Sequence, residues 1–418
     1  MQKKLLTLAV AGALAAPAAA LAQVEVYGTI HMSFNKMKYG ETTAPGTPSV
    51  SKWDVASHAS NVGVRARENI GGGQTAWIQV ETNASMERSN NVAHTSNFAS
   101  RNSAVGLQGG WGNIFLGQWT TPWADLDALW GIGTVATYGP ITSIIGRRET
   151  TGAAPNPNCG NNGSGIGGAG ANCDSVEAGG GVGHPFWRRI SNSIHYQSPV
   201  FGGVQFKVAY QTNQDKASTG VVADPQLWST SVQWAGMGGR LRVGAAYDGH
   251  KDFTSAGNTD TGWRVTGGWN FGFADIGVAY EQMTYKTFTS DCDATQWGVG
   301  IAIPIGQGAI RGAYSQADDI DGSYTGAQTA INTPLGSCGA VPTATAPSNN
   351  NGAKQYNLGY DYRFSKRTTV GFGYAKIDND SGAVFTWSGL SSANNGVAVT
   401  PSMGTDVEIF FVSMIHRF

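Results

Sequence analysis

Apolar and polar residues alternate along most of this chain with a period of two. In the segment 204–213 the apolar residues occupy alternate positions: Val204, Phe206, Val208 and Tyr210. Segments 241–248 and 355–364 repeat the pattern. Successive side chains of a β-strand point to opposite faces, so each segment predicts a strand with one apolar and one polar face. No comparable window sustains the 3.6-residue period of a helix, and the chain is predicted to be all-β.

Sixteen such segments can be separated along the chain, beginning with 24–34 and 58–68 and ending with 405–418. The connections between them alternate between short glycine-rich turns and long polar loops. A closed antiparallel barrel, with tight turns at one rim and large loops at the other, explains this asymmetry. We therefore predict a 16-stranded antiparallel transmembrane β-barrel with short periplasmic turns and long extracellular loops.

A soluble β-sandwich is the competing interpretation of the same alternation. Sixteen strands in simple up-and-down order leave no Greek-key connections from which to build two sheets. Only 13% of the residues are charged, 59 are glycine, and aromatic residues gather near strand ends, as an interfacial girdle requires. Beyond the N-terminal leader, no apolar stretch is long enough to cross a bilayer as a helix. Together these features favour the membrane barrel.

The N-terminus has the pattern of a secretory signal peptide. Lys3 and Lys4 precede an Ala/Leu-rich run that is interrupted at Pro17 and closes with Ala20-Leu21-Ala22. The proline and the small-x-small ending favour cleavage over a transmembrane anchor. We expect residues 1–22 to be removed and 23–418 to form the barrel. Without the two leader lysines, 25 basic residues face 28 acidic ones, so no basic excess is available for nucleic acid.

Four cysteines, Cys159, Cys173, Cys292 and Cys338, lie in polar, glycine-rich segments. Because an exported protein enters an oxidising compartment, they are interpreted as loop disulfides, for example Cys159 with Cys173 and Cys292 with Cys338. Free thiols remain the alternative. A metal site is disfavoured because no C-x-x-C pair or neighbouring histidine supplies four ligands, and no cofactor is predicted.

The glycine run in "NVGVRARENIGGGQTAWIQVE", residues 61–81, permits two interpretations. Glycine-rich loops can cradle a phosphate, but they do so at the start of a helix. The residues that follow, "QTAWIQVE", alternate as a strand does. "NIGGG" is therefore predicted to be a hairpin turn at the periplasmic rim.

Several stretches of the sequence resemble those of a known family. The stretches "VEVYGTI", "SNVGVRARENIGGGQTAWIQVE", "RNSAVGLQGGWGNIFLGQWTTPW", "RISNSIHYQSPVFGGVQF" and the terminal "HRF" occur in the order found in the trimeric general porins of Gram-negative bacteria, betaproteobacterial type. The resemblance implies a homotrimer in the outer membrane, in contact with membrane lipids and lipopolysaccharide. It also implies a third extracellular loop folded into the lumen and passive diffusion of small hydrophilic solutes.

By counting strands, the third loop runs from about residue 121 to 187. We expect the part before Arg148 to narrow the pore, because the distal composition is that of a flexible linker. Strand parity places charged residues of both signs inside the barrel, although many could be ordinary solvated rim charges. The candidates for the constriction are Asn61, Arg65, Arg67, Glu81, Gln118, Asp125, Asp127 and Arg189. Arg101 shares its parity with Val105 and Leu107, on the apparent lipid face, unless a bulge or the end of the strand re-aims it.

Two positions depart from the resembled family. Asn61 follows the serine of "SNVG", where those porins usually carry arginine, and Gln118 stands in "LGQW", where "LGRQ" is frequent. Two positive charges that commonly lie on the pore wall are missing. We therefore expect weaker anion selectivity than in the relatives.

The terminal Phe418 resembles the signal that the outer-membrane assembly machinery recognises. The second face of the last strand, with Ile409, Phe411 and Ile415, is unexpectedly apolar, and packing under the inserted loop is one explanation. A barrel enzyme is disfavoured because the seven histidines show no recurring Ser/Asp spacing. A channel selective for a sugar, carboxylate or aromatic acid is the closer alternative.

Overall fold

The computed structural model of the chain describes residues 23–40, 49–84, 86, 98–136, 138–145, 186–212, 226–252, 257–286, 291–321, 350, 352–381, 383, 385–387 and 404–418. In this part of the chain seventeen strands form one antiparallel sheet. Their bounds are β1 (Gln23–Tyr39), β2 (Val50–Ser57), β3 (Asn61–Gly71), β4 (Gln74–Asn83), β5 (Ser103–Gly109), β6 (Gly112–Thr120), β7 (Arg189–Gln197), β8 (Val204–Gln211), β9 (Gln226–Gly236), β10 (Leu241–Lys251), β11 (Thr259–Asn270), β12 (Asp275–Lys286), β13 (Asp291–Ile305), β14 (Gly308–Ala317), β15 (Ala353–Arg363), β16 (Thr368–Asn379) and β17 (Val407–Arg417).

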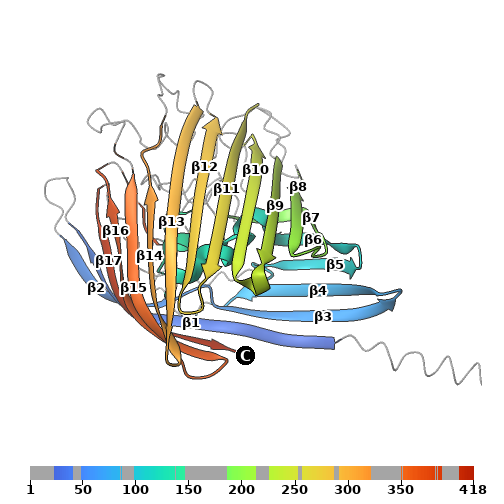
Figure 1. Cartoon of the computed structure of the whole chain (residues 1–418), viewed down its shortest axis with the longest axis horizontal. Helices are drawn as coiled ribbons and strands as arrows, with labels where there is room; N and C mark the ends of the chain where they lie inside the picture. Colours follow the sequence, from blue (N-terminus) through green and yellow to red (C-terminus); the bar gives the residue numbers. More distant parts are fainter. Residues whose placement is uncertain are drawn as a thin grey trace, which may run out of the picture.

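The sheet closes on itself. Strands adjacent in the chain are adjacent in space, and β17 pairs with β1 from Thr29 opposite Arg417 to Tyr39 opposite Val407. Figure 1 shows β9 to β14 side by side in chain order, with the short turns that join them at the lower rim. By the rule for outer-membrane barrels, the short-turn rim is the periplasmic one. The predicted barrel class is confirmed.

Two of the seventeen strands share one position in the wall. β1 pairs with β3 over Gln23–Thr29 and with β2 over Met32–Tyr39, so β2 and β3 together occupy the second of sixteen positions. The break between them includes Ala59, whose φ is 49°. The sequence prediction missed β2 and began the second strand at residue 58. The polar and charged residues of "VSKWDVASHAS" conceal the alternation there.

The two faces of the wall differ as the alternation predicts. On β12, Val278 and Tyr280 are exposed on the outside, whereas Ala279 and Glu281 are buried on the inside. Phe34 on β1 and Val412 on β17 are likewise exposed, at 52% and 53%. An outer surface of large apolar side chains suits the hydrocarbon of a bilayer.

The "NIGGG" segment is a hairpin turn between β3 and β4, as expected. Gly71 pairs with Gln74, and Gly71, Gly72 and Gly73 have φ values of 89°, 61° and 73°. Such values are readily adopted only by glycine, which explains the run of three. The alternative of a phosphate-binding loop is wrong, because a strand and not a helix follows.

Helical elements are short and belong to connections. They are α2 (Pro122–Asp125), α3 (Asp127–Trp130), η2 (Gly131–Gly133), η3 (Pro140–Thr142) and η4 (Met237–Gly239). Among the described residues, no helix has the length and apolar character needed to cross a membrane. All of these elements except η4 lie in the connection between β6 and β7.

Candidate pore constriction

The connection between β6 and β7 lies against the inner wall of the barrel. We call its described residues 121–136 and 138–145 the inserted segment. Trp123, Leu126 and Trp130 of this segment are fully buried. Figure 1 shows the helical segment, coloured teal, within the barrel behind β9 to β13. The apolar core of the molecule therefore lies between the inserted segment and the wall, inside the barrel.

The segment enters the barrel through a capped turn. The Thr121 hydroxyl accepts a hydrogen bond from the backbone N–H of Ala124 at 3.4 Å, and Pro122 occupies the first turn of α2. Threonine and proline favour these positions, because the hydroxyl satisfies a free N–H and the fixed proline φ is helical. The backbone N–H of Trp123 then donates to Ser229 Oγ on β9 at 3.2 Å.

Glycines let the inserted segment approach the wall closely. A Cβ atom on Gly277 of β12 would lie 2.2 Å from the carbonyl oxygen of Trp130, and one on Gly133 would lie 2.1 Å from that of Gly312. Gly300 on β13 likewise faces Gly133, with 2.9 Å from its Cβ position to the backbone nitrogen. In these contacts the backbone of the segment lies directly against the backbone of the wall, so only glycine fits without displacing the segment. Sequence reasoning counted the glycines but did not assign them this role.

Polar side chains of the wall hold the backbone of the segment. Asn357 donates to the carbonyl of Gly133 at 2.8 Å, Arg242 donates to that of Leu129 at 3.3 Å, and Arg311 donates to that of Ile132. The inserted segment is thus attached through its carbonyl oxygens to β10, β14 and β15.

The far end of the segment packs on the first and last strands. The Tyr138 hydroxyl lies 3.2 Å from His58 Nε2 and 3.3 Å from Ser33 Oγ, and its ring lies 4.7 Å from that of Phe411. Phe411 and Ile409 are both buried in the same apolar cluster. Packing under the inserted segment, the possibility raised from the sequence, therefore explains Ile409 and Phe411, whereas Ile415 lies outside this cluster.

The two acids near the start of the segment are paired with cations of the wall. Lys207 Nζ lies 2.8 Å from Asp125, and Asp127 accepts hydrogen bonds from Arg264 and from Trp187 Nε1. Desolvation raises the pKa of Asp125, and the Lys207 ammonium opposes that shift. The pairing compensates the cost of burying these charges.

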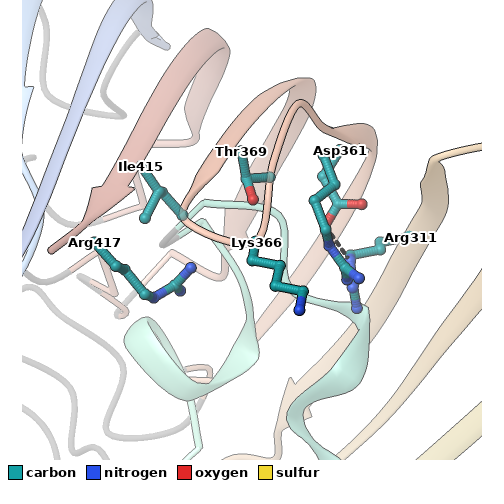
Figure 2. Close-up of a pocket in the computed structure, with 7 residues that line it drawn as sticks. Arg311, Asp361, Lys366, Thr369, Ile415 and Arg417 are labelled. Atoms are coloured by element: carbon teal, nitrogen blue, oxygen red, sulfur yellow. Dashed lines mark hydrogen bonds and ion pairs between the residues drawn. The ribbon is translucent and has the colours of Figure 1, made fainter.

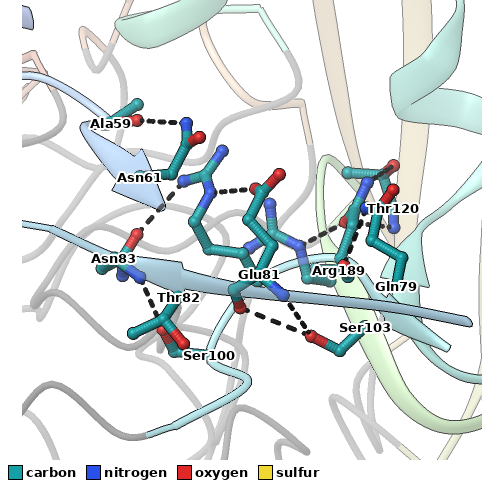
Figure 3. Close-up of polar contacts among 12 residues, drawn as sticks. Ala59, Asn61, Gln79, Glu81, Thr82, Asn83, Ser100, Ser103, Thr120 and Arg189 are labelled. Atoms are coloured by element: carbon teal, nitrogen blue, oxygen red, sulfur yellow. Dashed lines mark hydrogen bonds and ion pairs between the residues drawn. The ribbon is translucent and has the colours of Figure 1, made fainter. Parts of the chain in front are cut away.

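On the opposite wall, predicted site residues form a second set of polar contacts (Figure 3). Glu81 on β4 accepts from Arg101 at 2.5 Å and from the Tyr27 hydroxyl at 3.0 Å. Arg65 on β3 pairs with Glu25 at 2.8 Å, with both side chains about half exposed. Arg101 thus faces inward, contrary to its parity. The reason is that β5 begins only at Ser103, so Arg101 precedes the strand.

A hydrogen-bonded chain connects Arg189 to the inserted segment. Arg189 Nε donates to Asn102 at 2.7 Å, the Asn102 amide donates to Thr120 Oγ1 at 3.3 Å, and Thr120 donates to Asp125 at 3.3 Å. Among the predicted site residues, the structure brings Arg189 and Asp125 into one network.

The remaining predicted residues lie apart from this chain of contacts. Asn61 Nδ2 donates to the carbonyl of Ala59 at 3.0 Å, next to the break between β2 and β3. Gln118 Nε2 donates to the carbonyl of Ser100 at 3.0 Å, and Arg67 is exposed on β3. Their roles in the constriction stay predictions.

Sequence reasoning did not identify an aromatic cluster on the inner wall. Phe115 on β6 lies 5.4 Å from Trp77, 5.1 Å from Trp119 and 4.7 Å from His195, measured between ring centroids. Ile78 and Leu116, the neighbours in sequence, are exposed on the outer face. Trp77 and Trp119 are partly exposed on the inner side. The alternation around Trp77 in the sequence could have indicated that this ring faces the lumen.

The cysteine predictions fall mostly outside the described residues. Cys292, on β13, is disulfide-bonded and fully buried. Cys159, Cys173 and Cys338 lie outside the described part of the chain, as do Arg147, Arg148 and the distal part of the connection. The pairing of the four cysteines stays a prediction.

The sequence is similar to those of known outer-membrane proteins. The family model described as Gram-negative porin matches residues 7–382. The major outer membrane protein P.IB of Neisseria meningitidis serogroup A is 22% identical over 372 residues, 88% of this chain and 91% of that protein. A monosaccharide porin of Halomonas sp. is 24% identical over 344 residues, 76% of this chain and 80% of that protein.

Solved structures share the fold. An anion-selective porin from Comamonas acidovorans has a TM-score of 0.60 at 18% identity, covering 95% of this chain and 100% of that one. The trimer form of OmpT from Vibrio cholerae has a TM-score of 0.56 at 14% identity, covering 95% and 99%. With a closed barrel, an inserted segment on its inner wall and a family model matching most of its length, this chain belongs to the Gram-negative porin family.

Proposed function

We propose that this porin passes small hydrophilic solutes and ions of both signs through its lumen with weak selectivity. As a member of its family it is an outer-membrane channel for passive diffusion. The observation that supports weak selectivity is the pairing of lumenal cations with acids: Lys207 with Asp125, Arg264 with Asp127 and Arg65 with Glu25. Paired charges give a hydrated path with a local transverse field and little net preference for one sign.

The test is the reversal potential of single channels in a planar bilayer under a potassium chloride gradient. We expect a reversal potential close to zero, which corresponds to a chloride-to-potassium permeability ratio within about threefold of unity. A strong chloride preference would contradict weak selectivity while leaving the channel intact. The absence of conductance steps would contradict the channel itself.

The proposal includes a homotrimer in contact with membrane lipids and lipopolysaccharide. Family membership and the trimer form of the similar Vibrio cholerae structure support it. Insertion events with conductance steps in groups of three, together with cross-linking that yields a trimer, are the expected results. Single independent steps and a monomer on cross-linking would contradict this part.

We also propose export by a signal peptide at residues 1–22 and recognition of Phe418 by the outer-membrane assembly machinery. The first strand begins at Gln23, the residue that would follow cleavage. Phe418 exchanges two backbone hydrogen bonds with Gly28, at 3.2 and 3.1 Å, and so completes the closure of the barrel. The N-terminal sequence of the mature protein tests the cleavage site. We propose a channel and no catalytic activity.

A sugar-selective channel is the second candidate. The aromatic cluster of Trp77, Phe115 and Trp119 supports it, because flat rings on a lumenal wall suit the apolar faces of a sugar. The similar Halomonas protein is named a monosaccharide porin. Current blockade by one monosaccharide, lost in Trp119→Ala and retained in the outward-facing control Trp263→Ala, would favour this candidate. Equal passage of several unrelated sugars would favour the general pore.

A further inference from the structure

A polar cavity of about 370 Å³ opens on the lumen near the short-turn rim. Four neighbouring strands and the turn between β15 and β16 contribute to it. The residues that line it are Arg311, Asp361, Arg363, Lys366, Thr369, Ile415 and Arg417. Figure 2 shows Arg311, Lys366 and Arg417 directed toward the same space, with Asp361 beside Arg311. The cavity lies at the end of the lumen that we assign to the periplasm.

The cavity carries an excess of positive charge. Its lining has four cations and one carboxylate, so its formal charge is +3. The carboxylate of Asp361 is already engaged by Arg311, at 2.7 Å. Among the described residues, Arg363, Lys366 and Arg417 have no ion-pair partner, and all three side chains are exposed. This contrasts with the inserted segment, where acids compensate the wall cations.

Strand parity directs these groups to the lumen and not to lipid. On β15, Leu358 is 63% exposed on the outside, so Asp361 and Arg363 belong to the inner face. On β17, Met414 is exposed outside, so Ile415 and Arg417 point inward. The cations are therefore reached by water and by solutes that travel through the pore.

Local contacts order the turn that carries Lys366 and the side chain of Arg311. In the turn that carries Lys366, the hydroxyl of Ser365 accepts from the backbone N–H of Arg367 at 3.1 Å and from that of Thr368 at 3.0 Å. Arg311 is held between Asp361 and the carbonyl of Ile132 in the inserted segment. The cavity is thus built from ordered backbone and adjoins the base of the inserted segment.

Three unpaired cations around one cavity repel each other, and an anion with more than one charge relieves that repulsion. Guanidinium and ammonium groups are the donors that bind phosphate and carboxylate oxygens best. We propose that this cavity is a binding site for small multivalent oxyanions at the periplasmic mouth of the pore. The inference rests on the channel function proposed above. The excess positive charge would concentrate such anions at one mouth of an otherwise weakly selective pore.

The experiment uses the full-length protein in planar bilayers with inorganic pyrophosphate or citrate added to one side. The site variant is Arg363→Gln with Lys366→Gln. The matched control is Arg240→Gln with Arg367→Gln, which removes the same charge from two exposed turn positions outside the cavity lining, one of them in the same turn. Unitary conductance in chloride alone verifies that each variant forms the pore.

We expect brief current blockades in the parent protein, more frequent when the oxyanion is added at the short-turn side. The concentration for half-maximal blockade should rise about tenfold in the site variant and stay within about twofold in the control, since only the former loses two direct ligands. Blockade by pyrophosphate alone would assign a phosphate site, and blockade by citrate alone a carboxylate site.

Two results would overturn the inference: equal weakening in the site and control variants, or open channels in which neither anion blocks. In both, the conductance in chloride persists, so the channel function stands while the oxyanion site fails. A parent protein without conductance steps would instead count against the channel.

Discussion

The carbonyl oxygen of Trp130 lies 2.2 Å from the point that a Cβ atom on Gly277 would occupy. The inserted segment and β12 are therefore in backbone contact across the inner wall. Trp130, Gly133 and Gly300 extend the contact to β13. The width of the pore at this level therefore depends on glycines, whose lack of a side chain lets the segment lie close to the wall.

Gly277→Ala should displace the inserted segment from the wall. The added methyl group overlaps a backbone atom that cannot rotate away, and overpacking of this kind costs about 1–3 kcal/mol. We expect a lower thermal unfolding temperature and an altered unitary conductance. Gly267→Ala on β11 is the matched control, because its nearest neighbour to a Cβ lies at 3.6 Å. Equal behaviour of the two variants would contradict the close-approach interpretation.

Asp125→Asn should make the channel more selective for anions. The substitution leaves the Lys207 ammonium without its carboxylate partner at 2.8 Å, so positive charge dominates beside the inserted segment. We expect roughly a twofold rise in the chloride-to-potassium permeability ratio from the reversal potential. Lys207→Gln should shift the ratio the other way, and the double variant should return near the parent. Shifts of the same sign in both single variants would refute this pairing.

Acidification should produce part of the same effect. Desolvation raises the pKa of Asp125, so this carboxylate takes up its proton at a higher pH than an ordinary aspartate does. As the pH falls, the negative charge is lost and the Lys207 ammonium remains, so anion preference should increase between neutral pH and about pH 4. The measurement is the reversal potential as a function of pH. The change should be smaller in Asp125→Asn, and an identical pH profile in that variant would argue against Asp125.

Deletion of Phe418 should impair assembly. The residue forms both backbone hydrogen bonds to Gly28 that end the pairing of β17 with β1, and its ring fills the space beside that glycine. We expect several-fold less trimer in the outer membrane by heat-modifiability on gels. Phe364→Ala, which removes another exposed aromatic ring near the same rim, is the control. Normal trimer yield after the deletion would contradict this role.

The alternation of residues was sufficient to predict the barrel and the hairpin turn between β3 and β4. It was insufficient in two places. β2 was missed because its polar residues hide the period of two, and parity alone left the side of Arg101 open, because β5 starts only at Ser103.

The arrangement of the inserted segment could not be predicted from a local sequence pattern. The contact of Trp130 with Gly277 joins residues far apart in the chain, and a glycine carries no polarity from which its face could be read. The partners of the predicted acids were likewise hidden. The pairing of Lys207 with Asp125 and of Arg264 with Asp127 depends on how the segment lies in the barrel.

Part of the attachment between the wall and the inserted segment uses the main chain of the segment. Asn357, Arg242 and Arg311 all donate to carbonyl oxygens, and every residue type has a carbonyl oxygen. Side chains of the segment that face the water path can therefore be exchanged during evolution while the attachment persists. Substitutions that change the permeability of the pore need not disturb these main-chain contacts, so new solute preferences can arise without a change of fold.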